Sequence, residues 1–218
     1  MELNVPFIKQ PQDSVWCGPA TATMMLKFYG KNTSLKRVVE ELNLRSSQGV
    51  NNAHLASFFL SHNLNATVQA WPNGMTENLY SRKPINGNTA IKILKDNKGK
   101  VRGKARIMCR ELMALVKKGG NVIFSPITLD DLRNSIRNSS PVIVCIDMEH
   151  FRDISRKTGH YVLVYGITDP ESQVSQPYAY VHDSIRGKEK FIAVSKLLDA
   201  CNAWFGSAIF VSPRAVQC

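Results

Sequence analysis

One cysteine stands at the expected start of a helix, where a thiol is most easily ionised. Cys17 follows the polar loop 10–16, and Pro19 fits the first helical turn, where its missing N–H costs nothing. The helix is expected to end at Gly30, and its apolar stripe is Ala20, Thr21, Met24, Met25 and Phe28. Unpaired N–H groups at a helix start favour a thiolate, so Cys17 is a candidate nucleophile. The structural alternative is a small buried cysteine packed beside a helix, and this stretch does not separate the two.

A nucleophilic cysteine needs a base, and the base needs a group that orients it. His160 follows Gly159 at the start of a strongly apolar run, and Asp183 ends the next strand-like run. If these two strands pair antiparallel, the start of one lies beside the end of the other, which brings His160 next to Asp183. An aspartate in that place holds the imidazole in one tautomer and favours imidazolium. Without the cysteine, a strand-starting histidine and a turn-starting aspartate would be the better explanation of both residues, because each is common.

The other histidines and cysteines predict no metal site and no other cofactor. His54 and His62 lie eight residues apart without a third ligand, and His150 lies in the polar stretch 148–158. The five cysteines are scattered and form no CxxC pair, which argues against a zinc ribbon and a disulfide framework. We therefore expect a reducing compartment, the cytoplasm, because the N-terminus also shows no secretory signal. No apolar run is long enough to cross a membrane.

The elements that must position Cys17, His160 and Asp183 follow from apolar patterning. Turn residues separate the strand-like runs, and Thr128 with Asp131 resembles a capping box that opens a helix. We expect helices at 17–28, 35–42, 53–61, 105–118, 129–138 and 195–204, and strands at 65–71, 141–147, 159–167, 178–183 and 208–211 after an extended lead-in at 5–8. Helices come first and strands later, which indicates an α+β fold with an antiparallel sheet.

The middle of the chain differs from the rest in charge and regularity. Residues 72–104 are rich in Asn, Gly and Lys, and only a short helix near 90–94 is expected there. Residues 82–106 hold nine basic side chains and one acid, a net charge of +8 out of +11 for the whole chain. The segment is either a solvated loop or a surface for an acidic partner: a protein, a nucleic acid or a membrane surface. Nucleic acid is disfavoured because Tyr80 is the only aromatic residue nearby.

Several motifs in order resemble one family. VPFIKQ, WCGPATATMMLKFYG, PVIVCID, GHYVLVYGI and AYVHDS together resemble the C39-like branch of papain-like cysteine peptidases, in the form without a transporter domain. The resemblance covers residues 5–30 and 129–211, residues 31–71 are compatible with it, and 72–125 remain unmatched. It implies a papain-like fold in which N-terminal helices, the nucleophile helix among them, pack on a C-terminal antiparallel sheet. We expect one domain over 1–218 with a basic insertion at about 72–125.

The resemblance also implies roles for individual residues. Cys17 would be the nucleophile, His160 the general base and acid, and Asp183 the orienting group. A glutamine upstream of the cysteine would complete the oxyanion hole with the Cys17 N–H. The family usually has this glutamine five or six residues before the cysteine; Gln10 lies seven before it and Gln12 five. The motif favours Gln10 and the spacing favours Gln12; we expect Gln10 to form the oxyanion hole, with Gln12 as the alternative. Trp16 and Gly159, next to these residues, are candidates for substrate binding.

This set of residues predicts acyl transfer from an amide through a thioester. Hydrolysis of a peptide or protein substrate is the expected activity. The same residues also suit a glutamine deamidase or a transglutaminase-like enzyme that modifies a partner protein. A module that keeps the groove only to bind a peptide is a further alternative, although it would not need all three of Cys17, His160 and Asp183.

Overall fold

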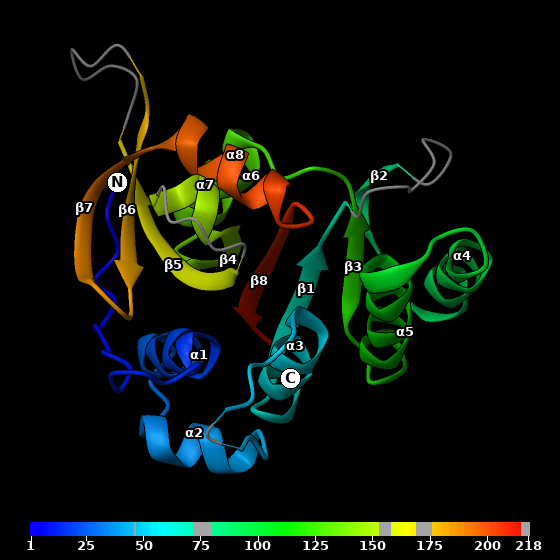
Figure 1. Cartoon of the computed structure of the whole chain (residues 1–218), viewed down its shortest axis with the longest axis horizontal. Coiled ribbons are helices and arrows are strands. Elements are labelled where there is room, and N and C mark those ends of the chain that lie inside the picture. The colour runs from blue at the N-terminus through cyan, green and yellow to red at the C-terminus, as the bar shows by residue number, and fades with distance from the viewer. Residues whose placement is uncertain (46, 72–79, 153–157, 169–175, 215–218) are drawn as a thin grey trace.

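The computed structural model describes residues 1–45, 47–71, 80–152, 158–168 and 176–214. Eight strands form a single sheet with helices packed against it (Figure 1). The helices are α1 (Cys17–Phe28), α2 (Leu35–Glu41), α3 (Asn52–Ser61), α4 (Gly87–Lys98), α5 (Gly103–Lys117), α6 (Leu129–Arg137), α7 (Met148–Arg152) and α8 (Val194–Ala203). The strands are β1 (Leu64–Gln69), β2 (Ser81–Ile85), β3 (Asn121–Phe124), β4 (Val142–Asp147), β5 (Gly159–Ile167), β6 (Tyr178–Asp183), β7 (Gly187–Ala193) and β8 (Ser207–Pro213).

The strand order is β2-β3-β1-β8-β4-β5-β6-β7, and Figure 1 shows it from right to left. Every neighbouring pair is antiparallel except β1 and β3, which run parallel. The predicted antiparallel sheet is therefore correct at β4 to β8, and it extends further through β1, which corresponds to the strand expected at 65–71, and through β2 and β3, which were not expected. The parallel pair is possible because α4 and α5 lie between β1 and β3 along the chain and supply the long connection that parallel strands need.

The nucleophile helix α1 forms where the apolar stripe predicted it and is buried almost all round. Every residue from 18 to 26 is buried, so α1 lies inside the core rather than on its surface. Gly18 permits close packing at its start, because a Cβ there would collide with Val50 and would lie 3.2 Å from the Tyr161 ring. Packing of α1 on β5 thus fixes Cys17 against the strand that carries His160.

The region expected to be irregular contains regular structure. Within 72–104 the structure has β2 and the twelve-residue helix α4, where only a short helix was expected; residues 72–79 lie outside the described residues. Only Ala90, Leu94 and Asn97 of α4 are buried, so its apolar pattern is too sparse to mark a full helix. Strands β3 and β7 and helix α7 were also not predicted. Helix α8 begins at Val194 rather than after a Ser195 cap. The extended lead-in at 5–8 does not form a strand.

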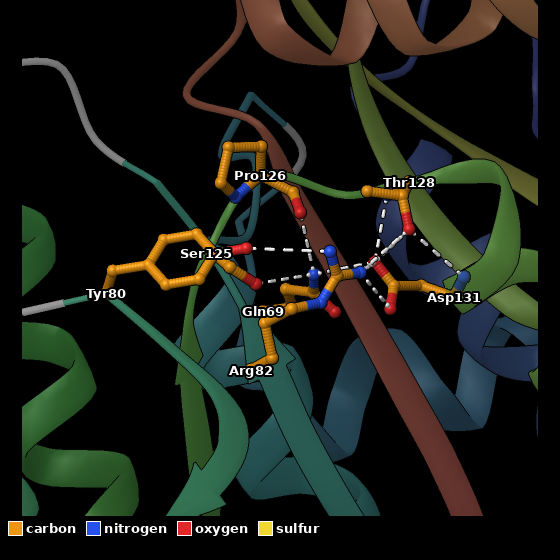
Figure 2. A network of polar contacts seen from close by, with 7 residues as sticks. All are labelled: Gln69, Tyr80, Arg82, Ser125, Pro126, Thr128 and Asp131. Carbon is orange, nitrogen blue, oxygen red and sulfur yellow. Dashed lines mark hydrogen bonds and ion pairs between the residues drawn. The ribbon is translucent and has the colours of Figure 1, made fainter. Parts of the chain in front are cut away.

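A polar network joins β1, β2 and the start of α6 (Figure 2). Thr128 and Asp131 form the predicted capping box, so α6 begins with its N–H groups satisfied. The buried amide of Gln69 donates to Asp131 Oδ2 at 3.0 Å, and Arg82 Nη2 donates to Asp131 Oδ1 at 3.1 Å. Asp131 therefore holds three elements together, and Arg82, although part of the basic segment, is engaged in an ion pair.

Candidate active site

Cys17 opens into a cavity that the predicted site residues share. It is the first residue of α1 and is partly exposed, whereas Cys109, Cys145 and Cys201 are buried. The cavity holds about 400 Å³ and is lined by Gln10, Ser14, Val15, Cys17, Gly49, Val50, Met148, Thr158, Gly159, His160, Tyr161 and Ile185. The thiol is thus accessible from the one cavity that also contains His160.

The expected pairing of the two C-terminal strands brings His160 to Asp183. Strands β5 and β6 are antiparallel with Leu163 opposite His182, so the start of β5 lies beside the end of β6. His160 Nε2 lies 2.9 Å from Asp183 Oδ1, and both side chains are buried. The same imidazole hydrogen-bonds with the Cys17 thiol, which places the ring between the thiol and the carboxylate.

Asp183 is held by more partners than sequence reasoning identified. Arg152 Nη2 donates to Asp183 Oδ2 at 2.8 Å, and the Ile185 N–H donates to Oδ1 at 3.0 Å. Arg152 ends the five-residue helix α7, within a stretch expected to be a polar loop. No local pattern marks such a residue, because its role depends only on the fold bringing α7 to the end of β6.

The electrostatics of these three groups favour a thiolate beside an imidazolium. Burial raises the pKa of the Cys17 thiol, but the hydrogen bond and charge of His160 outweigh burial, so the pKa lies below that of an ordinary thiol. Burial lowers the pKa of His160, but its hydrogen bonds to Asp183 and Cys17 raise it to about 9. Burial likewise opposes ionisation of Asp183, while His160 and Arg152 hold its pKa well below the usual carboxyl range.

Gln10 and Gln12 are placed very differently. Gln10 is buried and lines the cavity with Cys17, whereas Gln12 is exposed and does not line it. Gln10 Nε2 donates to the Ser14 carbonyl at 2.7 Å, and its Oε1 accepts from Ser184 Oγ at 2.8 Å. Ser184 directly follows Asp183, so the strand end that orients His160 also fixes Gln10. The geometry thus brings Gln10 to the site and leaves Gln12 outside it.

The two residues expected to bind substrate also differ. Gly159 lines the Cys17 cavity, but Trp16 is half-buried and is not among the lining residues. A Cβ at Gly159 would collide with the indole of Trp204, so this position has no room for a side chain. Trp204 lines the cavity that adjoins the Cys17 cavity, whereas Trp16, although it directly precedes Cys17, lines neither of the two.

A second cavity adjoins the first. It holds about 310 Å³ and shares Val50, Gly159 and Tyr161 with the Cys17 cavity. Its wall contains a chain of hydrogen bonds in which Tyr161 Oη donates to Asn52 Oδ1 at 2.7 Å, and Asn52 Nδ2 donates to Ser207 Oγ at 2.7 Å. The helices α3 and α5 contribute the far wall, with Ala53 and Leu112 among the lining residues. The second cavity thus lies between the Cys17 cavity and α5, with Val50, Gly159 and Tyr161 at the boundary of the two.

The described residues offer nothing else that resembles a reaction centre. No cluster of three His, Cys, Asp or Glu side chains in this part of the chain could hold a metal ion. His62 Nε2 lies 2.7 Å from the Glu41 carboxylate, and His54 is exposed on α3. Among the helices described, none combines the length and apolar character that a bilayer crossing requires.

Comparison with known proteins agrees with this architecture. The sequence matches the Peptidase_C39 like family over residues 2–203. The chain belongs to this family. A C39-like peptidase from Bacillus anthracis has a similar structure (TM-score 0.56, 14% identity, 97% of this chain and 96% of that one). So does a double-glycine-motif protease from an AMS/PCAT transporter, solved with a leader peptide (TM-score 0.50, 15% identity, 98% and 94%).

These comparisons confirm the expected family and the fold of C39 peptidase domains, which is papain-like. At 14% and 15% identity the solved structures establish the fold alone. No curated protein matches the sequence significantly. The geometry of this chain, and not these comparisons, is therefore the basis for assigning roles to individual residues.

Proposed function

We propose that this C39-like protein is a cysteine peptidase that uses Cys17, His160 and Asp183 to hydrolyse peptide bonds. The observation that carries this proposal is the hydrogen-bonded series from Cys17 through His160 to Asp183, which opens into a cavity that also contains Gln10. A buried cysteine with a purely structural role would need neither the charged imidazole nor access to a cavity.

The proposed reaction follows from these positions. The Cys17 thiolate attacks the carbonyl carbon of the scissile peptide bond and forms a C–S bond, while the carbonyl π electrons move to oxygen. The Cys17 N–H and the amide of Gln10 stabilise that oxyanion, and the Gln10 amide exchanges its longer hydrogen bond to Ser14 Oγ, at 3.3 Å, for the oxyanion. The C–N bond breaks, and the leaving amine takes its proton from His160.

Hydrolysis of the thioester completes the cycle. Water gives a proton to the now neutral His160 and attacks the acyl carbon, and the C–S bond breaks to release Cys17 as a thiolate. Asp183 stays ionised throughout, because Arg152 and the Ile185 N–H share its charge. It orients the imidazole and stabilises the imidazolium of each step without accepting a proton.

Two observations support a peptide as the substrate. A second cavity adjoins the Cys17 cavity, so a substrate with several residues has neighbouring places for more than one side chain. The similar transporter protease was solved with a leader peptide, a ligand of the same chemical class.

Alkylation of Cys17 tests the thiolate directly. We expect iodoacetamide to modify Cys17 faster than Cys109 on the acid side of the ordinary thiol pKa, because the Cys17 pKa is lowered. His160→Ala should remove this advantage, whereas His54→Ala, an exposed control on α3, should not. Peptide mapping by mass spectrometry at a series of pH values measures the rates. Equal rates for Cys17 and Cys109 in the wild type would contradict the proposal.

The reaction type needs a separate measurement. A peptide library is incubated with the wild type and, separately, with Cys17→Ala. Only the wild type should cleave peptide bonds, so that the masses of the two fragments add up to the mass of the peptide plus one water. Ammonia release from glutamine side chains without backbone cleavage would instead identify a deamidase. If Cys17 is reactive but the protein binds peptides and leaves them unchanged, the protein is a peptide-binding module.

A further inference from the structure

Helices α4 and α5 lie at the β2–β3 end of the sheet (Figure 1). A groove between these two helices gathers positive charge. It holds about 600 Å³. Its rim carries five basic side chains: Lys95, Lys98, Arg106, Arg110 and Lys117. Gly99, Met113 and Ala114 complete the lining, and no acidic residue takes part. The groove thus combines an uncharged floor with a wholly basic rim.

The rim cations have only weak electrostatic neighbours in the described part of the chain: the charge of Arg110 acts on the Glu111 carboxyl, and that of Lys98 acts on the Cys109 thiol. None of them forms an ion pair or a side-chain hydrogen bond there, and four are exposed while Lys98 is half-buried. Other cations of the basic segment are engaged elsewhere: Arg82 pairs with Asp131, and Lys104 Nζ lies 4.7 Å from the centre of the Trp204 ring. The groove therefore concentrates the charge that the fold itself does not use.

Helix α5 separates this groove from the second cavity, which adjoins the Cys17 cavity. One side of α5 lines the second cavity through Lys104, Met108 and Leu112. Its other side lines the basic groove through Arg106 and Arg110. Between them the side chain of Ile107, 47% exposed, lines the second cavity and offers an apolar contact toward solvent. A peptide that fills both cavities therefore reaches α5, and the opposite side of α5 lines the basic groove.

We propose that the groove between α4 and α5 binds an acidic segment of the same peptide whose scissile bond lies at Cys17. This inference rests on the proposed peptidase function. Carboxylates of the segment pair with the rim cations, and apolar side chains between them contact Met113 and Ala114. A peptide fits better than a nucleic acid, because no aromatic residue lines the groove to stack on bases. The groove then selects substrates, while the triad supplies the chemistry.

The first arm of the test measures binding without chemistry. A fluorescein-labelled peptide of alternating Glu and Leu is titrated into full-length Cys17→Ala protein, beside an otherwise identical peptide with Gln in place of Glu. We expect the Glu peptide to bind more tightly, with an affinity that falls as salt is raised. The double variant Arg106→Gln/Arg110→Gln should weaken it by about five- to tenfold. Lys31→Gln/Lys36→Gln, which removes two exposed cations far from the groove, should change it less than about twofold.

The second arm connects the groove to Cys17. The same peptides are made with a chloroacetyl group attached through Gly-Ser spacers of increasing length. They are added to wild-type protein, which keeps Cys17, and mass spectrometry follows alkylation of that residue. At one spacer length the Glu peptide should label Cys17 faster than the Gln peptide, because the groove raises the local concentration of the electrophile. Arg106→Gln/Arg110→Gln should abolish this gain and leave the rate with free chloroacetamide unchanged.

Three results would overturn the inference. The Glu and Gln peptides could bind equally, the two double variants could lose affinity equally, or no spacer could give faster labelling by the Glu peptide. Stronger displacement of the peptide by a thymidine oligonucleotide or by phosphatidylserine vesicles would also reject it, in favour of a nucleic acid or a membrane. Slow labelling by free chloroacetamide at every pH would instead reject the proposed peptidase, and the binding arm would still decide the groove.

Discussion

At the scale of single residues, Asp183 is the point where catalysis and stability meet. Its buried carboxylate accepts hydrogen bonds from His160, Arg152 and the Ile185 N–H. Two cations thus share one carboxylate, and a neutral residue there would remove a counter-charge from both His160 and Arg152. The charge balance around the buried Asp183 carboxylate therefore depends on whether His160 is protonated.

Replacing Asp183 by asparagine should affect both properties. We expect the free energy of unfolding to fall by about 3 kcal/mol near neutral pH, because Arg152 loses its buried partner. The His160 pKa should fall from about 9, and alkylation of Cys17 on the acid side should slow. Urea denaturation and the iodoacetamide profile measure the two effects, with exposed Asp199→Asn as the control.

The stability difference between wild type and Asp183→Asn should change with pH in two ranges. Folding raises the pKa of His160 to about 9, so the difference should grow as the pH falls from about 9 toward the ordinary histidine pKa of about 6.5. Folding lowers the pKa of Asp183, so the difference should shrink again as the pH falls below the ordinary carboxyl pKa of about 4. A difference that grows on acidification below about pH 4 would contradict the assigned ion pair.

The two glutamines offer a matched pair of substitutions. Gln10→Ala should lower kcat about 100-fold and change KM little, because an oxyanion exists only during the reaction. Gln12→Ala should leave both constants within about twofold, since its side chain is exposed. Steady-state kinetics on a cleaved peptide measures this. Equal losses for both variants, or a lower alkylation rate for Gln10→Ala, would mean that Gln10 has a structural role instead.

At the scale of elements, Asp131 joins β1 and β2 to the start of α6 (Figure 2). Asp131→Ala should lower the free energy of unfolding by about 2 kcal/mol, because the Thr128 N–H loses its capping acceptor and the buried Gln69 amide loses one of its three acceptors. Asp130→Ala, one residue earlier with its side chain 80% exposed, should cost less than about 0.5 kcal/mol. Urea denaturation followed by circular dichroism compares the two. A similar loss in both would show that helix propensity, rather than the network, determines the effect.

Elements were predictable from sequence where burial leaves a periodic apolar pattern. Helix α1 and strands β4 and β5 have almost every position buried, and their runs identified them. Helix α4 buries three residues of twelve, so its sequence resembles that of a solvated loop. The positions of Cys17, His160 and Asp183 followed from motif order and strand pairing. Arg152, Ser184 and Tyr161 act through contacts across the fold, and residue type alone does not reveal such contacts.

At the scale of the whole molecule, the sheet runs without a break from β2 beside α4 to β7 at the far edge. The hydrophobic core likewise extends from Ala90 and Leu94 in the basic segment to Val181 in β6. A continuous core favours a single cooperative unit, although the sequence suggests an insertion at about 72–125.

We therefore expect one unfolding transition for the full chain. Tryptophan fluorescence and far-ultraviolet circular dichroism should give the same midpoint in urea, and amides of α4 should exchange hydrogen only slightly faster than those of α1. A separate early transition, in which α4 and α5 lose protection before α1, would mean that the insertion is an independent unit.

The packing of Trp204 has a practical consequence. Its indole lies against Gly159, faces the cavity next to Cys17 and has the Lys104 ammonium above its ring. Anything that fills this cavity must change the polarity around the indole or displace the ammonium. The molecule therefore contains an intrinsic optical reporter, whose emission can register occupancy in unlabelled protein before any bond is broken.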